Sequence, residues 1–159
     1  MANSLFLDAE LLENDLRKII RTEIRKKETI KQFGEIYLVP ADTDLNEKIL
    51  FPAVSIEVHK NGPYALTQED IEVEPFSRFS VTVETYTNGS NKRSMNMKLA
   101  QFITSVLQTN QQLENYYNRG LKLDQERELS SFIEGVSRRV VRFSGIVDNA
   151  SKVIYNKEI

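Results

Sequence analysis

Hydrophobic residues recur at helical spacing in two parts of the chain. The first stretch runs from about Asp8, a suitable N-cap, to Phe33, and the second begins near Ser90 and continues as a polar helix to about Tyr116. The two apolar stripes hold Leu12, Leu16, Ile19, Ile20 and Ile24 in the first stretch and Met95, Leu99, Phe102, Ile103 and Val106 in the second. Each stretch is therefore predicted to form one amphipathic helix with a face that packs on a core.

Alternation with a period of two predicts strands elsewhere. It is clearest in Phe79–Tyr86, where Phe79, Val81 and Val83 oppose Ser80, Thr82 and Glu84. The other predicted strands are Glu35–Pro40, Phe51–Val58, a stretch from about Phe132 to Val147, and Lys152–Tyr155. The resulting order is α-β-β-β-α-β-β. It indicates the α+β class, with an antiparallel or mixed sheet flanked by two main helices.

Length and composition favour one domain over residues 1–159, because 40% of the residues are hydrophobic and 28% are charged. There is no cysteine, which excludes disulfides and thiolate chemistry. We expect no secretory signal and no membrane span, since no apolar run approaches the roughly 18 residues that a span needs. The expected folding compartment is a reducing cytoplasm.

Charge is unevenly distributed, although the net charge is only −2. From Arg17 to Lys31 seven basic residues accompany two acidic ones, a local net of +5, and four of them share one helix face: Arg17, Lys18, Arg21 and Arg25. This face either keeps the helix soluble or binds phosphates or an acidic protein surface.

The segment from about 60 to 75 is predicted to be a long loop or a projecting hairpin arm, because Asn61-Gly62-Pro63 is a turn signal. From Asn61 to Ser77 the chain is acidic, with Glu69, Asp70, Glu72 and Glu74 and no basic residue. Carboxylates on one strand face suit calcium or magnesium, but they are about 7 Å apart along a strand, and no calcium-loop motif is present. We therefore expect a solvated acidic arm and no metal or cofactor.

Catalysis requires a clustered nucleophile, base and orienting group, or a metal site. His59 is the only histidine, and the chain lacks the nucleophile-elbow, phosphate-loop, dinucleotide and zinc-protease motifs. We expect that the protein is not an enzyme and has no catalytic residue.

The stretch Val136–Val147 carries Arg138, Arg139 and Arg142 among its apolar residues, so neither strand face is purely apolar. These arginines, with the nearby aromatics Phe143 and Tyr155, are candidates for an interface or a lumen that contacts DNA. The alternative is that all three extend to water over the apolar surface.

Four segments together resemble the tail-terminator (tail-completion or minor tail) proteins of tailed bacteriophages. They are Phe51–Val58, Ser77–Asn88, the amphipathic helix that follows, and Arg138–Asp148 with Val153–Tyr155. The resemblance covers roughly Phe51 to Tyr155 and adds an N-terminal helix of the expected kind. The chain departs from it in the acidic region from Lys60 to Glu74 and in the polar stretch from Gln108 to Ser131.

The resemblance implies a structural virion protein that forms a homohexameric ring at the tail–neck junction. Such a ring caps the tail tube, ends its polymerisation and joins it to neck and head-completion proteins, while DNA passes transiently through its lumen. The basic helix face and the acidic arm are then candidates for subunit or neck contacts. The expected location is the virion, and the host cytoplasm during assembly, with no membrane partner. Two alternatives are a neck or head-completion (connector) protein and a non-specific DNA-binding module.

Overall fold

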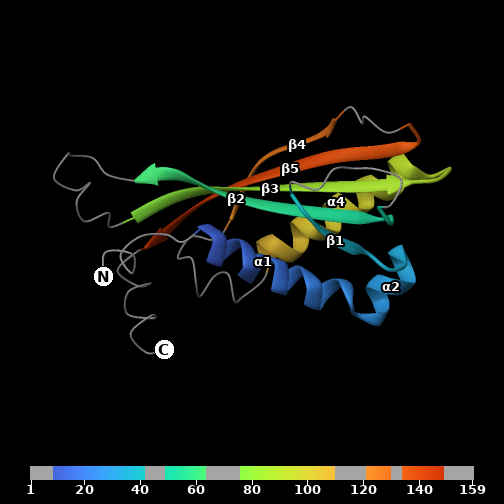
Figure 1. The fold of residues 1–159 in the computed structure, drawn as a ribbon, viewed down its shortest axis with the longest axis horizontal. Coiled ribbons are helices and arrows are strands. Elements are labelled where there is room, and N and C mark those ends of the chain that lie inside the picture. The colour runs from blue at the N-terminus through green and yellow to red at the C-terminus, as the bar shows by residue number, and fades with distance from the viewer. Residues whose placement is uncertain (1–8, 42–48, 64–75, 110–120, 130–133, 149–159) are drawn as a thin grey trace.

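The computed structural model describes residues 9–41, 49–63, 76–109, 121–129 and 134–148. Its helices are α1 (Ala9–Ile24), α2 (Lys27–Phe33) and α4 (Lys92–Thr109), and its strands are β1 (Tyr37–Pro40), β2 (Ala53–Pro63), β3 (Phe76–Asn88), β4 (Lys122–Leu129) and β5 (Val136–Asp148) (Figure 1). The sheet has the order β1-β2-β3-β5-β4. β1 pairs with β2 in parallel, and every other pair is antiparallel. The predicted α+β class and mixed sheet are confirmed.

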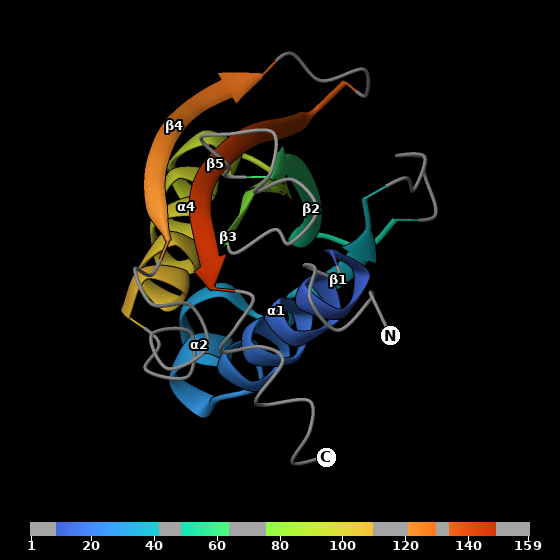
Figure 2. The same cartoon turned by 90° about the vertical axis from the view of Figure 1, so that its left-hand side faces the viewer.

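Two main helices flank the sheet, as predicted, and both cover the same face. α1 packs on β2, and α4 packs on β3 and β5 (Figure 1). Figure 2 shows β4 and β5 curving along their length. The core between the layers includes Leu12, Leu16, Ile20, Leu99, Ile103, Val54, Ile56, Phe79, Val81, Val83, Val141 and Phe143. Alternate residues of β2, β3 and β5 therefore reach this core, and the residues between them lie on the second sheet face, which is mostly polar.

The first helix is not continuous, so the prediction of one helix from about Asp8 to Phe33 is wrong. Lys26 has an extended backbone, with φ −66° and ψ 144°, and separates α1 from α2. The Thr29 hydroxyl donates to the Glu23 carbonyl at 2.9 Å, and the Lys26 N–H donates to the same carbonyl at 3.3 Å, so this carbonyl keeps partners where the helix ends. The break lets both Ile24 and Phe33 enter the core.

β4 was not predicted, because its segment reads as a polar stretch. It pairs with β5 from Lys122 opposite Ser144 to Leu129 opposite Arg138, with an irregularity between Leu123 and Gln125. The predicted strand at 152–155 and the predicted helical turns from 110 to 116 lie outside the described residues. No helix in the described part of the chain is long and apolar enough to cross a membrane.

Three strands continue past the helical layer (Figure 1). The core residues of β2 end at Val58 and those of β3 begin at Phe79, yet the pairing of these strands reaches Pro63 opposite Ser77. β5 accompanies them to Asp148, opposite Phe76. We call the strand ends 61–63, 76–78 and 146–148 the projecting ladder. It forms the base of the predicted arm, and the rest of that arm, 64–75, lies outside the described residues.

Candidate functional site

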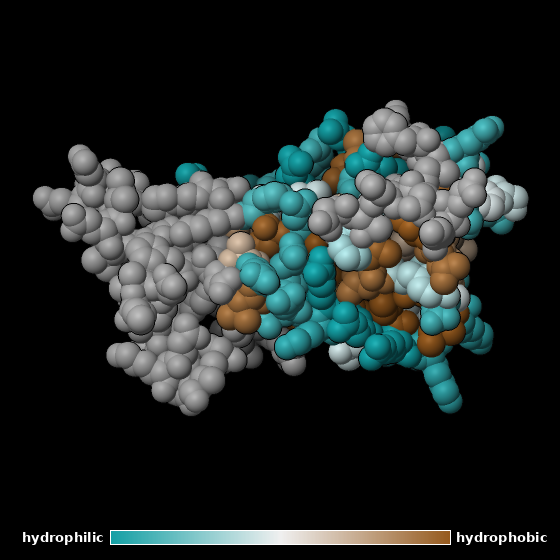
Figure 3. Space-filling view, viewed as in Figure 1, coloured by the Kyte–Doolittle hydropathy of each residue, from teal (hydrophilic) through white to brown (hydrophobic). Residues whose placement is uncertain are grey.

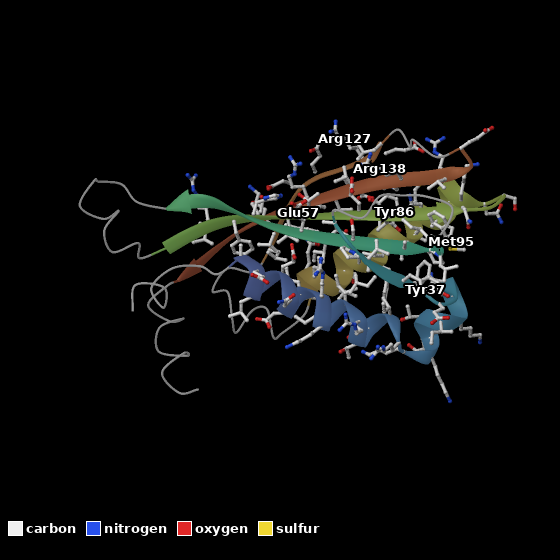
Figure 4. All side chains as sticks on the ribbon, in the orientation of Figure 1. Tyr37, Glu57, Tyr86, Met95, Arg127 and Arg138 are labelled. Atoms are coloured by element: carbon white, nitrogen blue, oxygen red, sulfur yellow. The ribbon has the colours of Figure 1, made fainter. Side chains whose placement is uncertain are left out.

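The register of β5 separates its three arginines. Arg138 lies opposite Tyr86 and Arg142 opposite Thr82, both on the polar sheet face, while Arg139 lies opposite Thr85 on the helix side. The three arginines spread over both faces of one strand thus have different environments. Figure 4 labels Arg138 between Arg127 of β4 and Tyr86 of β3, with Glu57 of β2 further along the sheet.

Arg138 belongs to a polar network on the sheet face. Its Nε donates to Glu84 Oε1 at 3.0 Å, and its Nη2 donates to the same oxygen. The Tyr86 hydroxyl donates to the other carboxylate oxygen, Glu84 Oε2, at 2.6 Å. Charge-assisted bonds of this kind are the stronger ones in proteins, so we expect the network to hold β3 and β5 in register.

Tyr86 is almost fully buried, although it lies on the polar face. Burial raises the pKa of Tyr86 to about 12, and the hydrogen bond to Glu84 adds to the rise. The phenol therefore stays protonated at neutral pH and acts as a hydrogen-bond donor. This argues for a structural role, because a base or nucleophile would need a lowered pKa.

Arg139 joins a second polar group beneath α4. Its Nη2 lies 3.4 Å from Glu126 Oε1 of β4, and only 13% of its side chain is exposed. Nearby, Asn96 of α4 donates through Nδ2 to the Thr85 carbonyl at 3.1 Å and to Ser137 Oγ at 3.2 Å. These bonds tie the start of α4 to β3 and β5.

In the described part of the chain, three buried side-chain polar atoms have no hydrogen-bond partner, and all three belong to this second group. These atoms are Thr85 Oγ1, Asn96 Oδ1 and Arg139 Nε. Buried polar atoms normally find partners, because an unpaired one costs about 1–3 kcal/mol. This side of the sheet therefore holds a polar seam inside an otherwise apolar core.

The polar face carries several exposed cations on β4 and β5. Arg142, Arg127 and Lys122 are exposed, and no ion pair within the described ranges joins them to a carboxylate. Small hydroxyl residues lie among them, since Lys122 is opposite Ser144 and Arg142 is opposite Thr82. Guanidinium and hydroxyl groups together suit phosphates or the carboxylates of another chain.

The predicted basic helix face divides in two. Arg17 is partly buried and bonds within the chain, to the Ile56 carbonyl and to Glu13. Lys18 and Arg21 are exposed on the side of α1 away from its buried residues, and Arg25, directly after the end of α1, is exposed too. Figure 3 shows hydrophilic side chains along this outer side of α1. Only these three are placed for contact with another molecule.

Phe143 does not belong to an interface or a lumen, so that prediction is wrong. It is completely buried in the core, because its side chain points to the helix-covered face of the sheet, as that of Val141 does two residues earlier. The other aromatic candidate, Tyr155, lies outside the described residues. The four acidic candidates of the arm, Glu69, Asp70, Glu72 and Glu74, lie outside them too.

No group of three or more histidine, aspartate or glutamate side chains in the described ranges is arranged to hold a metal ion. His59 Nε2 lies 3.0 Å from Glu57 Oε1, but both side chains are about half exposed, at 55% and 46%. Such a pair is weakly coupled in water. It offers no oriented nucleophile or enclosed cavity for chemistry.

No protein-family model matches the chain, and no curated protein matches its sequence. The candidate site is therefore defined by the geometry of the structure alone. Two of its parts were not predicted from the sequence. Glu84 and Tyr86 share a strand face two residues apart, and Glu13 and Arg17 are four apart on one helix. Both spacings can be read from the sequence, but the strands that these side chains contact cannot.

Proposed function

We propose that this protein is a structural component of a phage tail, a terminator that forms a ring and caps the tail tube. The observation that carries the proposal is the projecting ladder, in which three strands stay paired beyond the helical layer. No described helix covers this ladder. It therefore suits contact with another subunit, because paired strands become more stable when another surface packs on them. The strand-strand-helix-strand pattern of the resembling segments supports the same reading.

Ring formation requires two different surfaces on each subunit that complement each other. The sheet ends in β1 on one side and in β4 on the other, so in a ring its two edges would face opposite neighbours. The exposed Lys18, Arg21 and Arg25 give α1 a positive outer side, while segment 64–75 is acidic in sequence. Head-to-tail docking of unlike surfaces would close such subunits into a ring, with the predicted number being six.

The cations of the polar face, Arg142, Arg127 and Lys122, are proposed to face the lumen. Exposed guanidinium groups attract a passing DNA backbone without reading its sequence. A separate DNA-binding role is a second candidate, favoured by the same three cations. It predicts that the purified protein binds duplex DNA with an affinity that falls by about one log unit per log unit of salt for each phosphate contacted.

The deciding experiment mixes the purified chain with tail tubes that lack a terminator and images them by negative stain. We expect a six-fold ring at one end of each tube and no further growth when tube protein is added. Binding to tailless heads and not to tubes would instead identify a neck or head-completion protein. Binding to neither, with salt-sensitive DNA binding, would leave only the DNA-binding role.

The same mixture tests the surface of α1. Charge reversal at Arg21 and Arg25 (Arg21→Glu with Arg25→Glu) is expected to weaken the ring, and most strongly at low salt, where opposite charges attract most. Both side chains are exposed, so the monomer should keep its stability within about 0.5 kcal/mol. Ring formation equal to that of the unaltered protein would contradict the pairing of charged surfaces.

A further inference from the structure

The outer edge of β2 is longer than the strand that covers it. β1 pairs with β2 only from Ala53 to Ile56, whereas β2 continues to Pro63. An edge strand presents unpaired N–H and C=O groups that can accept a strand from another chain. In the described part of the chain, no strand pairs with this edge beyond Ile56.

Two side chains of α1 occupy the first hydrogen-bonding positions beyond β1. Glu13 Oε1 accepts the Val58 N–H at 3.0 Å, and Arg17 Nη2 donates to the Ile56 carbonyl at 3.4 Å. The two side chains also pair with each other, with Arg17 Nη2 3.5 Å from Glu13 Oε2. We call this pair the edge bracket.

The edge bracket imitates a neighbouring strand. A strand would offer one acceptor and one donor at these positions, and the carboxylate and guanidinium offer the same two groups. Its side chains keep only 21% and 23% exposure, and buried Leu12 and Leu16 hold the helix turns that carry them. The bracket is therefore a fixed part of the fold, in contrast to the exposed ion pairs of the surface.

We propose that the edge bracket guards β2 against strand addition, and that displacing it lets the edge accept a strand from a second copy of this chain. The strand that fits is β4, because it is eight residues long and no described strand pairs with its outer side. The edge bracket would keep free subunits from pairing through β2 before their assembly begins. This goes beyond the proposed function, since it holds whether or not the protein caps a tube.

The test removes the bracket with Glu13→Ala and Arg17→Ala together. Val58 amide exchange is expected to become at least about 10-fold faster in dilute solution, since one charge-assisted hydrogen bond is lost. At rising concentration the variant should show an increasing mass in sedimentation velocity. The amides of β2 beyond Ile56 and of β4 should then become protected together.

The matched control is Glu10→Ala with Asn14→Ala, which has the same spacing on the exposed side of α1. It should leave both the mass and the Val58 exchange unchanged. Glu13→Gln keeps an oxygen acceptor and should retain most of the protection, so it serves if the double alanine variant unfolds. Unchanged Val58 exchange in folded Glu13→Ala, or fast exchange without association, would overturn the guard. Protection of β2 without β4 would overturn the choice of β4.

Discussion

Replacing Gly145 by valine is expected to lower the free energy of unfolding by about 2–3 kcal/mol. Gly145 lies opposite Phe79 across β3 and β5, and both face the helical layer. A Cβ at this position would come within 2.9 Å of Phe79 Cε1 and 3.0 Å of Cε2, and closer still to Cζ. Because Phe79 is completely buried, its ring cannot move into solvent, and the clash must deform the core.

Chemical denaturation followed by circular dichroism measures this loss. Ser144→Val is the matched control, because it adds valine one residue earlier, on the opposite sheet face, and should change stability by less than about 0.5 kcal/mol. Phe79→Leu with Gly145→Ala should be less unstable than the sum of the two single changes, since leucine vacates the space that the new methyl needs. Gly145→Val at the stability of the unaltered protein would contradict this account of the packing.

The second large effect is expected from Glu84→Ala, which should cost about 2–3 kcal/mol. The change removes the acceptor of both Arg138 and Tyr86 at once and takes the Glu84 carboxylate away from a partly buried guanidinium. Fully buried pairs cost about 3–5 kcal/mol when broken. The value here is lower because the Arg138 and Glu84 side chains keep 23% and 18% exposure, which lets water screen the Arg138 charge.

Glu57→Ala is the control for Glu84→Ala, since both are glutamates on the same sheet face. The Glu57 carboxylate pairs with His59, but both side chains are about half exposed, so its removal should cost less than about 1 kcal/mol. Equal losses for the two variants, measured by urea unfolding, would show that the network contributes no more than a surface ion pair.

Tyr86 gives the same network a pH dependence. Its pKa is about 12 in the folded chain and about 10 when unfolded, so its contribution to stability is complete below about pH 10. It is lost as the pH rises toward 12, because the unfolded state then releases a proton that the folded state retains. Unfolding measured from pH 9 to pH 12 should show a flatter decline for Tyr86→Phe than for the unaltered protein. Parallel curves would contradict the role of Tyr86.

The alternation of strand residues and the helical spacing of apolar residues were sufficient to predict the elements that pack around the core. Phe79, Val81 and Val83 are completely buried, as their period of two predicts, and Leu12, Leu16, Ile20 and Ile24 line the buried side of α1. A burial pattern follows from local geometry, because side-chain direction repeats every two residues in a strand and every 3.6 in a helix. The α+β class was predictable for the same reason.

The limits of local pattern appear at β4 and at the helix break. Residues 122–129 are rich in Lys, Gln, Glu and Arg, which favour helix, yet they form a strand because they pair with the edge of β5. No glycine or proline marks the break at Lys26. It is the burial of both Ile24 and Phe33 that requires the chain to turn there.

The sequence by itself determined the alternating strands that line the core, β2, β3 and β5, and that three arginines share one of them. Only the tertiary structure decided what each arginine does, because the answer depends on strands far away in the chain. Arg138 meets Glu84, Arg139 meets Glu126, and Arg142 stays exposed. Strand register sets these contacts, and register arises from long-range pairing and from the core that buries one face, which no local window of residues contains.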